Sequence, residues 1–212
     1  MKPDKQRSGL IDISQPVAPG IPVWPGDTEY HRFWVMQMDR GDSCNVGSTT
    51  MSLHTGTHAD APLHFRQGGV SISEVALDVY FGPALVVDAL NAPQITVDYL
   101  NDLPESTPER LLFKTHSDMP ETFDTDFCCL STDAARMLVG SGVKLVGLDT
   151  PSVDPFDSKT MESHHILTEG GVAILENLAL QEVTAGVYEL IAFPLKLVGM
   201  DASPVRAVLR VV

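Results

Sequence analysis

Short apolar runs bounded by turn residues dominate the hydrophobic pattern of this chain. Residues 10–14 alternate between apolar and polar side chains, the period-two pattern of a half-buried strand. The other runs are rich in β-branched, aromatic and apolar residues, a composition typical of strands. The pattern predicts strands over residues 10–14, 31–38, 46–53, 83–89, 110–115, 127–130, 143–148, 172–175, 188–193 and 205–211.

Two segments carry the start and stop signals of helices. Ser131 opens an Ala-rich amphipathic stretch that ends at Gly140 and Gly142. A second helix is predicted over residues 158–168, stopped by the glycine pair at 170–171. Strands therefore outnumber helices, and we expect a mixed α/β fold with a barrel-like β core flanked by a few helices.

The chain length of 212 residues suits one domain with a buried core. Residues 1–9 are predicted to be a flexible polar tail, and residues 10–212 to form the domain. Within it, residues 15–27 hold so many prolines and glycines that neither helix nor regular strand is expected. This segment is predicted to be a loop that carries Trp24.

The net charge of −14 argues against a nucleic-acid partner, because a phosphate backbone would be repelled over most of the surface. The short basic start is not followed by an apolar segment, so no signal peptide is predicted. The longest apolar stretches contain charges and proline, so no membrane span is expected. Three cysteines form neither a disulfide framework nor a C-x-x-C pattern, which fits a reduced cytoplasm.

The most informative segment is the run from His54 to His64. It places His54, His58, Asp60 and His64 at positions of the same parity, with small or apolar residues at most positions between them. An extended backbone would aim all four polar groups at one side. Three of the seven histidines of the chain fall here, around one aspartate. This density favours a metal site over the alternative, a half-exposed strand with surface histidines.

A fully extended run, however, cannot make that site. At ~3.4 Å per residue, His54 and His58 would lie about 13 Å apart, too far to share an ion bound at about 2 Å. The chain must curl, and Gly56 and Pro62 are placed to allow this. Imidazole and carboxylate without thiolate suit Zn²⁺, or a harder ion such as Mn²⁺, and one carboxylate can bridge two ions.

A second group of polar residues lies downstream and is weaker evidence by itself. Glu176 follows an apolar run, where it could face a cleft or simply the solvent. His164 and His165 would point about 100° apart on a helix, so at most one of them can face a given site.

The run at residues 54–64 resembles the signature of the cyclase family of metal-dependent hydrolases. Further blocks make the chain similar to one subgroup, the bacterial kynurenine formamidases, or arylformamidases of tryptophan breakdown. The resemblance extends from about Ile11 to the C-terminus. Besides the signature, its blocks are residues 23–27, 148–155, 163–165, 175–177, 194–196 and 201–207.

The resemblance implies a role for each candidate residue. One Zn²⁺ would be held by His54, His58 and Asp60, and a second by Asp60, His164 and Glu176, with Asp60 as the bridge. The spacing to Glu176 matches His164 rather than His165. His64 takes the position of the proton-transferring residue, and Trp24 that of an aromatic substrate contact. Read without the resemblance, Trp24 could instead cap an edge of the core. The family fold implied is a mixed α/β architecture, usually assembled as dimers or larger oligomers.

The implied reaction is the hydrolysis of N-formyl-L-kynurenine, an aryl formamide, to L-kynurenine and formate. Metal-activated water would be the nucleophile and His64 the proton shuttle. Two alternatives remain: another hydrolase of this family, acting on isatin or a cyclic amide or ester, and a non-catalytic metal-binding module. A serine or cysteine hydrolase has little support, because the chain lacks a G-x-S-x-G elbow and Cys128 and Cys129 lie in a strand-like run.

Overall fold

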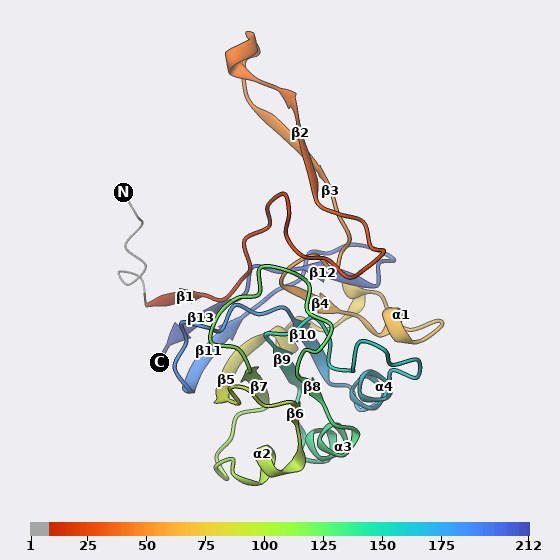
Figure 1. Cartoon of the computed structure of the whole chain (residues 1–212), viewed down its shortest axis with the longest axis vertical. Helices are drawn as coiled ribbons and strands as arrows, with labels where there is room; N and C mark the ends of the chain where they lie inside the picture. The colour runs from red at the N-terminus through yellow and green to blue at the C-terminus, as the bar shows by residue number, and fades with distance from the viewer. Residues whose placement is uncertain (1–8) are drawn as a thin grey trace.

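A mixed sheet of parallel and antiparallel strands curls into a half-barrel at the centre of the structure (Figure 1). The computed structural model describes residues 9–212, so the predicted tail at residues 1–9 falls almost wholly outside the described residues. The strands are β1 (Leu10–Asp12), β2 (His31–Met36), β3 (Val46–Thr50), β4 (His58–Asp60), β5 (Phe81–Asp88), β6 (Gln94–Ile95), β7 (Arg110–Lys114), β8 (Cys129–Leu130), β9 (Leu145–Leu148), β10 (Ala173–Glu176), β11 (Gly186–Ile191), β12 (Ala202–Pro204) and β13 (Val208–Val211).

Nine of these strands make the main sheet, in the order β1-β13-β11-β5-β7-β9-β10-β4-β12. The central strands β5, β7, β9 and β10 run parallel, and all other neighbours pair antiparallel. The strands β2 and β3 form a separate hairpin, and β6 pairs with β8. The prediction of a mixed α/β domain with a barrel-like core is confirmed.

Alternate residues of the central strands face two separate cores, as the period of two in a strand requires. On one face, Phe113, Leu148 and Ile174 pack under the helices. On the other face, Leu112 and Leu145 pack with residues of the antiparallel strands. The parallel strands are buried on both faces, which explains why they appear in the sequence as continuous apolar runs.

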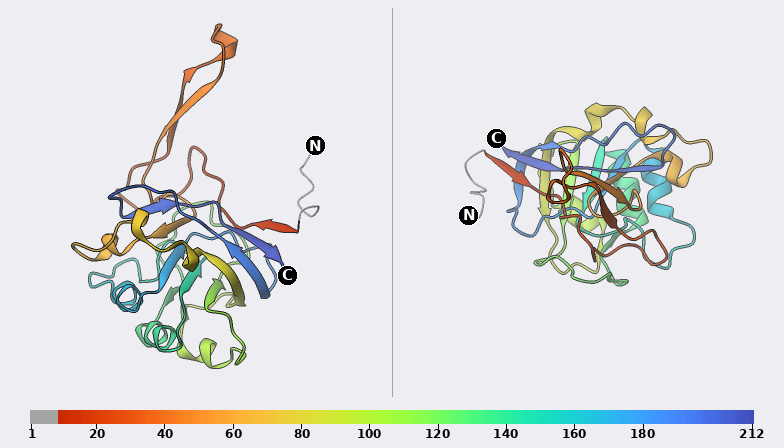
Figure 2. Two further views of the ribbon diagram at one scale, coloured as in Figure 1. Left: turned by 180° about the vertical axis from the view of Figure 1, so that it is seen from behind. Right: turned by 90° about the horizontal axis from the view of Figure 1, so that it is seen from above.

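Four α-helices accompany the sheet, and α2, α3 and α4 lie together on one side of it (Figure 2). They are α1 (Pro62–Phe65), α2 (Val97–Asn101), α3 (Thr132–Gly140) and α4 (Glu162–Glu169), with 3-10 turns at Met38–Arg40, Ile72–Glu74 and Leu77–Tyr80. The first predicted helix is confirmed as α3, and the hydroxyl of Ser131 accepts a hydrogen bond from Ala134 N at 3.2 Å.

The predicted start of the second helix at residue 158 was wrong, because α4 begins at Glu162. Met161 adopts a left-handed backbone with φ of 48° and cannot belong to the helix. Its amide instead donates to the hydroxyl of Ser158, which closes a turn before α4. The end of α4 at the glycine pair was predicted correctly.

The remaining differences concern short elements and strand ends. The helices α1 and α2, the 3-10 turns and the strands β6 and β12 were not predicted, because two to five residues are too few to show a period. Several predicted strands extended too far at one end. The observed β1, β2, β3 and β11 end earlier than predicted, and β8, β9 and β13 begin later.

The hairpin of β2 and β3, called the arm from here on, projects away from the rest of the domain (Figures 1 and 2). Residues on both of its faces are exposed, among them the large apolar side chains of Phe33, Trp34, Val35, Met38 and Val46. A two-stranded ribbon is marginally stable in water, so an arm with uncovered apolar side chains lacks a core of its own.

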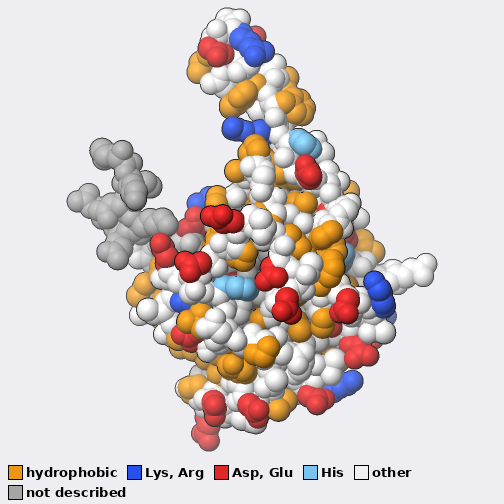
Figure 3. All heavy atoms as spheres, viewed as in Figure 1, with side chains coloured by type: hydrophobic (Ala, Val, Ile, Leu, Met, Phe, Trp, Pro, Cys, Tyr) orange, Lys and Arg blue, Asp and Glu red, His pale blue; other side chains and the backbone are white. Residues whose placement is uncertain are grey.

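Within residues 9–212, each helix is too short or too polar to cross a lipid bilayer. The predictions of a cytoplasmic protein that binds no nucleic acid stay predictions. Acidic side chains outnumber basic ones on the face shown in Figure 3, in keeping with the net charge of −14.

Candidate metal centre and adjoining pocket

The backbone of residues 54–64 curls, as the distance estimate required. Gly56 has a φ of 65°, in the left-handed region that favours glycine, and turns the chain just before β4. After β4, Pro62 takes the first position of α1, where proline needs no hydrogen-bond partner for its nitrogen. The segment is therefore a turn, a three-residue strand and a short helix.

Strand pairing brings Glu176 to the same place. It is the last residue of β10 and lies opposite His58 of β4 in the antiparallel register. His58 is 1% exposed and Glu176 4% exposed. The alternative of a solvent-exposed glutamate is therefore wrong, and His58 is not a surface histidine.

The helix α4 contributes a further histidine to the cluster. His164 is 1% exposed, and its Nε2 lies 3.2 Å from Glu176 Oε1 and 3.8 Å from Asp60 Oδ2. The neighbouring His165 is not part of the cluster, in agreement with the choice made from the spacing. Thus α4 brings its histidine to β4 across more than a hundred residues of sequence, beside Glu176 of β10, which follows it closely in the chain.

Asp60 lies at the centre of the assembled group. Its Oδ1 lies 3.2 Å from His54 Nδ1 and 3.5 Å from His58 Nε2. His58 Nε2 is also 3.4 Å from Glu176 Oε2. Ligand atoms converge in two triples that share this aspartate: His54, His58 and Asp60, and Asp60, His164 and Glu176. These are the two triples that the resemblance implied, and their role as ligands remains a proposal.

Each histidine of the cluster is fixed from behind by an oxygen. His54 Nε2 contacts Asp201 Oδ2 at 2.9 Å, and His58 Nδ1 contacts the carbonyl of Gly56 at 2.8 Å. His164 Nδ1 contacts Asp154 Oδ2 at 2.6 Å. Carbonyl and carboxylate oxygens only accept, so each outer nitrogen carries a hydrogen. A neutral ring then presents the lone pair of its other nitrogen to the cluster, the arrangement seen behind metal-binding histidines.

Three inner atoms of the cluster lack hydrogen-bond partners. Both carboxylate oxygens of Asp60 and the Nε2 of His58 are buried without a hydrogen bond of acceptable geometry, although other cluster atoms lie within 3.5 Å. A buried, unsatisfied carboxylate is costly unless a cation compensates it. These atoms all offer lone pairs and lie close together, so an ion bound between them would satisfy them at once. The donor set of imidazole and carboxylate fits Zn²⁺ or Mn²⁺.

The electrostatics of the cluster also favour a cation. Burial alone lowers the pKa of His54, but the carboxylates of Asp60 and Asp201 outweigh it and raise the pKa to about 9. His164 behaves alike: burial lowers its pKa, and Asp154 and Glu176 raise it to about 9. Burial raises the pKa of Asp60, yet its histidine neighbours hold that pKa well below the usual value. The site thus attracts positive charge, and protons must leave when a metal ion binds.

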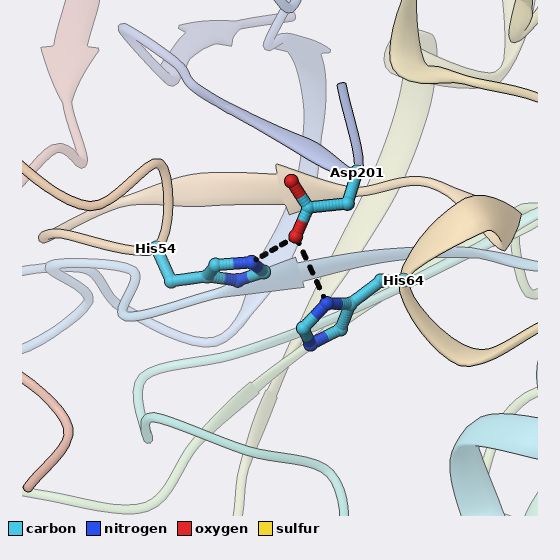
Figure 4. Close-up of side chains that lie close together, drawn as sticks. All are labelled: His54, His64 and Asp201. Carbon is cyan, nitrogen blue, oxygen red and sulfur yellow. Dashed lines mark hydrogen bonds and ion pairs between the residues drawn. The ribbon is translucent and has the colours of Figure 1, made fainter. Parts of the chain in front are cut away.

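His64 lies beside the cluster and is joined to it by Asp201 (Figure 4). A single oxygen, Asp201 Oδ2, contacts His64 Nδ1 at 3.1 Å and His54 Nε2 at 2.9 Å. Burial is the largest effect on His64 and lowers its pKa, with Asp60 acting in the opposite direction. No role was predicted for Asp201, although it begins a block on which the resemblance rests.

A cavity of about 690 Å³ opens onto the cluster. Its wall includes His54, His58, His64, His164 and Glu176 together with three aromatic rings, those of Trp24, Phe123 and Phe127. Trp24 packs edge-on against Phe123 at 5.4 Å and tilted against Phe156 at 5.1 Å between ring centroids. The structure therefore places the proline-rich loop in the wall of this cavity.

Comparison with known proteins identifies similar chains over most of this length. The model of the cyclase family matches residues 11–155. A structure described as a potential metal-dependent hydrolase with cyclase activity is 32% identical, with a TM-score of 0.82, covering 94% of this chain and 96% of that chain. A predicted metal-dependent hydrolase from Bacillus stearothermophilus is 30% identical, with a TM-score of 0.79 and coverage of 94% and 97%. Isatin hydrolase A from Labrenzia aggregata is 23% identical, with a TM-score of 0.80 and coverage of 95% and 93%, a likeness of fold.

The shared position of Asp60 leads to a prediction for metal content. Asp60→Asn keeps the size of the side chain but removes its charge, so metal affinity should fall at both positions by more than about ten-fold. Metal analysis after dialysis against buffered Zn²⁺ measures the number of ions per chain. Asp118→Asn, a change at an exposed aspartate outside the cluster, is the control and should retain its ions. An Asp60→Asn protein with both ions still bound would rule out the bridging role.

Proposed function

We propose that this chain, which belongs to the cyclase family of metal-dependent hydrolases, hydrolyses N-formyl-L-kynurenine to L-kynurenine and formate. The observation that carries this proposal is one cavity in which the histidine–carboxylate cluster and three aromatic rings share the wall. An aryl formamide has both matching parts, a hydrolysable carbonyl and a flat ring. Stacking of its ring on Trp24 would contribute about 1 kcal/mol beyond the burial of area.

Hydrolysis of a formanilide adds water to the formyl carbon and breaks its bond to nitrogen. One proton must leave the water, and one must reach the departing aryl amine. Divalent ions held by His54, His58, Asp60, His164 and Glu176 would make water acidic enough to react near neutral pH and would polarise the formyl oxygen.

His64 is the residue proposed to move the proton. Its Nδ1–H donates to Asp201, so the lone pair of a neutral ring is on Nε2. In the cavity wall, this nitrogen takes a proton from the attacking water and passes it to the leaving nitrogen. Asp201 fixes the tautomer and the direction of the ring and acts through His64 as a positioning residue.

The central test is activity before and after metal removal. We expect purified protein to contain a divalent ion and to hydrolyse N-formyl-L-kynurenine faster than isatin. Exhaustive chelation should abolish turnover, and added Zn²⁺ or Mn²⁺ should restore it. Activity that survives complete metal removal would contradict a metal-dependent reaction. A preference for isatin would keep the hydrolase but replace its substrate, and tightly bound metal without any hydrolysis would favour a metal-binding module.

A change at His64 separates proton transfer from metal binding. His64→Asn should keep the metal content and lower kcat by about 10²- to 10⁴-fold, the usual contribution of a general acid–base group. Metal analysis and steady-state kinetics on one preparation measure both quantities. His165→Gln is the matched control, since this neighbour of His164 lies outside the cluster. Wild-type turnover in the His64→Asn protein would remove His64 from the mechanism.

We also propose that the chain forms a homodimer through the arm. Two uncovered apolar surfaces of the same chain support a second copy as the partner. One is the arm, with Phe33, Trp34 and Val35 about half exposed. The other lies on the domain, where the exposed rings of Phe81 and Phe193 stack at 6.1 Å. In a dimer with two-fold symmetry, both copies contribute the same surfaces, so the arm and the surface at Phe81 and Phe193 each occur twice in the interface.

Sedimentation of an arm variant tests the dimer. Phe33 and Val35 of β2 are both more than half exposed, so replacing both with serine should weaken association by about a hundred-fold or more while the domain stays folded. Thr50→Ser, at the end of β3, is the control and should sediment as a dimer. Either a monomeric wild-type protein or a double variant that still dimerises would contradict the arm interface.

A further inference from the structure

One histidine of the cavity wall takes no part in the metal cluster or in the proposed proton transfer. His116 follows β7 and lines the cavity together with Phe123 and Asp124. Its imidazole side chain is 25% exposed, so it is accessible from the cavity. The mechanism above gives it no task.

The ring of His116 is held in one orientation by its neighbours. The hydroxyl of Thr115 donates its only hydrogen to Asp149 Oδ1 at 2.6 Å. The contact of 2.9 Å between Thr115 Oγ1 and His116 Nδ1 must then be donated by the ring. The main-chain amide of His116 also donates to Asp149. Among the described residues, none hydrogen-bonds to His116 Nε2, so this nitrogen remains for a ligand. With Nδ1–H donating to Thr115, Nε2 donates to a ligand when the ring is protonated.

Charge makes this position unusual within the cavity. No lysine or arginine of residues 9–212 lines the wall, whereas Asp27, Asp124 and three further carboxylates do. An anionic group of a ligand would be repelled along most of the wall. The side-chain interaction with Asp149, whose Oδ1 lies 3.6 Å from His116 Nδ1, is the main cause that raises the pKa of His116, while burial opposes it and Asp124 adds to the rise. Apart from the metal cluster and His64, which is bound to Asp201, His116 is the one wall residue of the described chain that can carry positive charge.

Asp124 provides a matching acceptor. It follows Phe123, one of the three rings of the wall, and it is exposed. Its Oδ1 accepts the amide of Asp126 at 2.9 Å, while no hydrogen bond within the described residues occupies Oδ2. A group attached to a ring that packs on Phe123 would therefore meet a carboxylate and an imidazole near each other.

We propose that His116 and Asp124 bind the zwitterionic α-amino-acid end of the substrate, with His116 donating to the carboxylate and Asp124 accepting from the ammonium group. This subsite rests on the proposed function, since it completes recognition of an aryl formamide that carries an amino acid beside its formamide. The ring packs among the aromatic side chains, the formamide faces the metal cluster, and the amino acid reaches the pair at the other side of the ring.

Binding of two product-like ligands tests the subsite without requiring turnover. L-Kynurenine carries the amino-acid end, and ortho-aminoacetophenone has the same ring and ketone without it. Calorimetry on the metal-loaded protein gives the Kd of each ligand. His116→Ala and Asp124→Asn should each weaken L-kynurenine binding by about ten-fold, because each removes one hydrogen bond to a charged group. The Kd of ortho-aminoacetophenone should stay unchanged in both variants.

Two further variants sharpen the measurement. His116→Gln keeps an N–H donor in a side chain of similar reach and should recover part of the lost affinity. His31→Ala removes a histidine of the arm, outside the cavity wall, and should change neither Kd.

Several outcomes would overturn the subsite. Equal weakening of both ligands by His116→Ala would mean that the ring only shapes the cavity. Unchanged L-kynurenine binding in both variants would place the amino-acid end elsewhere. No L-kynurenine binding by the wild-type protein would contradict the subsite altogether. Failure of the proposed function is seen separately, as a wild-type protein that binds L-kynurenine with the expected dependence on His116 but does not hydrolyse its N-formyl derivative.

Discussion

The buried carboxylate of Asp60 is the constraint on which the site depends. Its two oxygens lie out of water without hydrogen bonds, in the middle of His54, His58 and His164. Such a group is tolerated only where positive charge can be supplied, by protons on the imidazoles or by metal ions. The polar structure around it serves this need, because oxygens satisfy the ring nitrogens that face away from the cluster, while His58 Nε2, which faces it, has no hydrogen bond.

The same constraint explains why so little regular structure is needed to build the site. A three-residue strand, the end of another strand and one helix hold the inner groups, and the tight turn at Gly56 brings His54 back toward Asp60. Sheet pairing fixes Glu176 opposite His58 and leaves no freedom of register, since a shift of one residue would turn the carboxylate to the other face. Asp201 then connects the cluster to His64 through one shared oxygen.

Beyond the cluster, the cavity wall combines three kinds of side chain: aromatic rings, the histidines and carboxylate of the cluster, and the polar pair of His116 and Asp124. A ligand with a ring, a formamide and an amino acid offers one group to each. The arm lies outside this division, and its exposed apolar side chains suit contact with another molecule rather than with the substrate.

The sequence by itself determined the elements with a clear period and the identity of the main cluster residues. The central strands, α3 and the end of α4 followed from local patterns, and the parity of His54, His58 and Asp60, together with the distance limit, required a curled segment. Tertiary structure decided the rest. The burial of Glu176, the orientation of His164, the bridging position of Asp201 and the pairing of His116 with Asp149 depend on strand register and helix packing between distant segments. A local pattern carries no record of such contacts, because sheet pairing and the packing of α4 bring the residues together only when the chain folds.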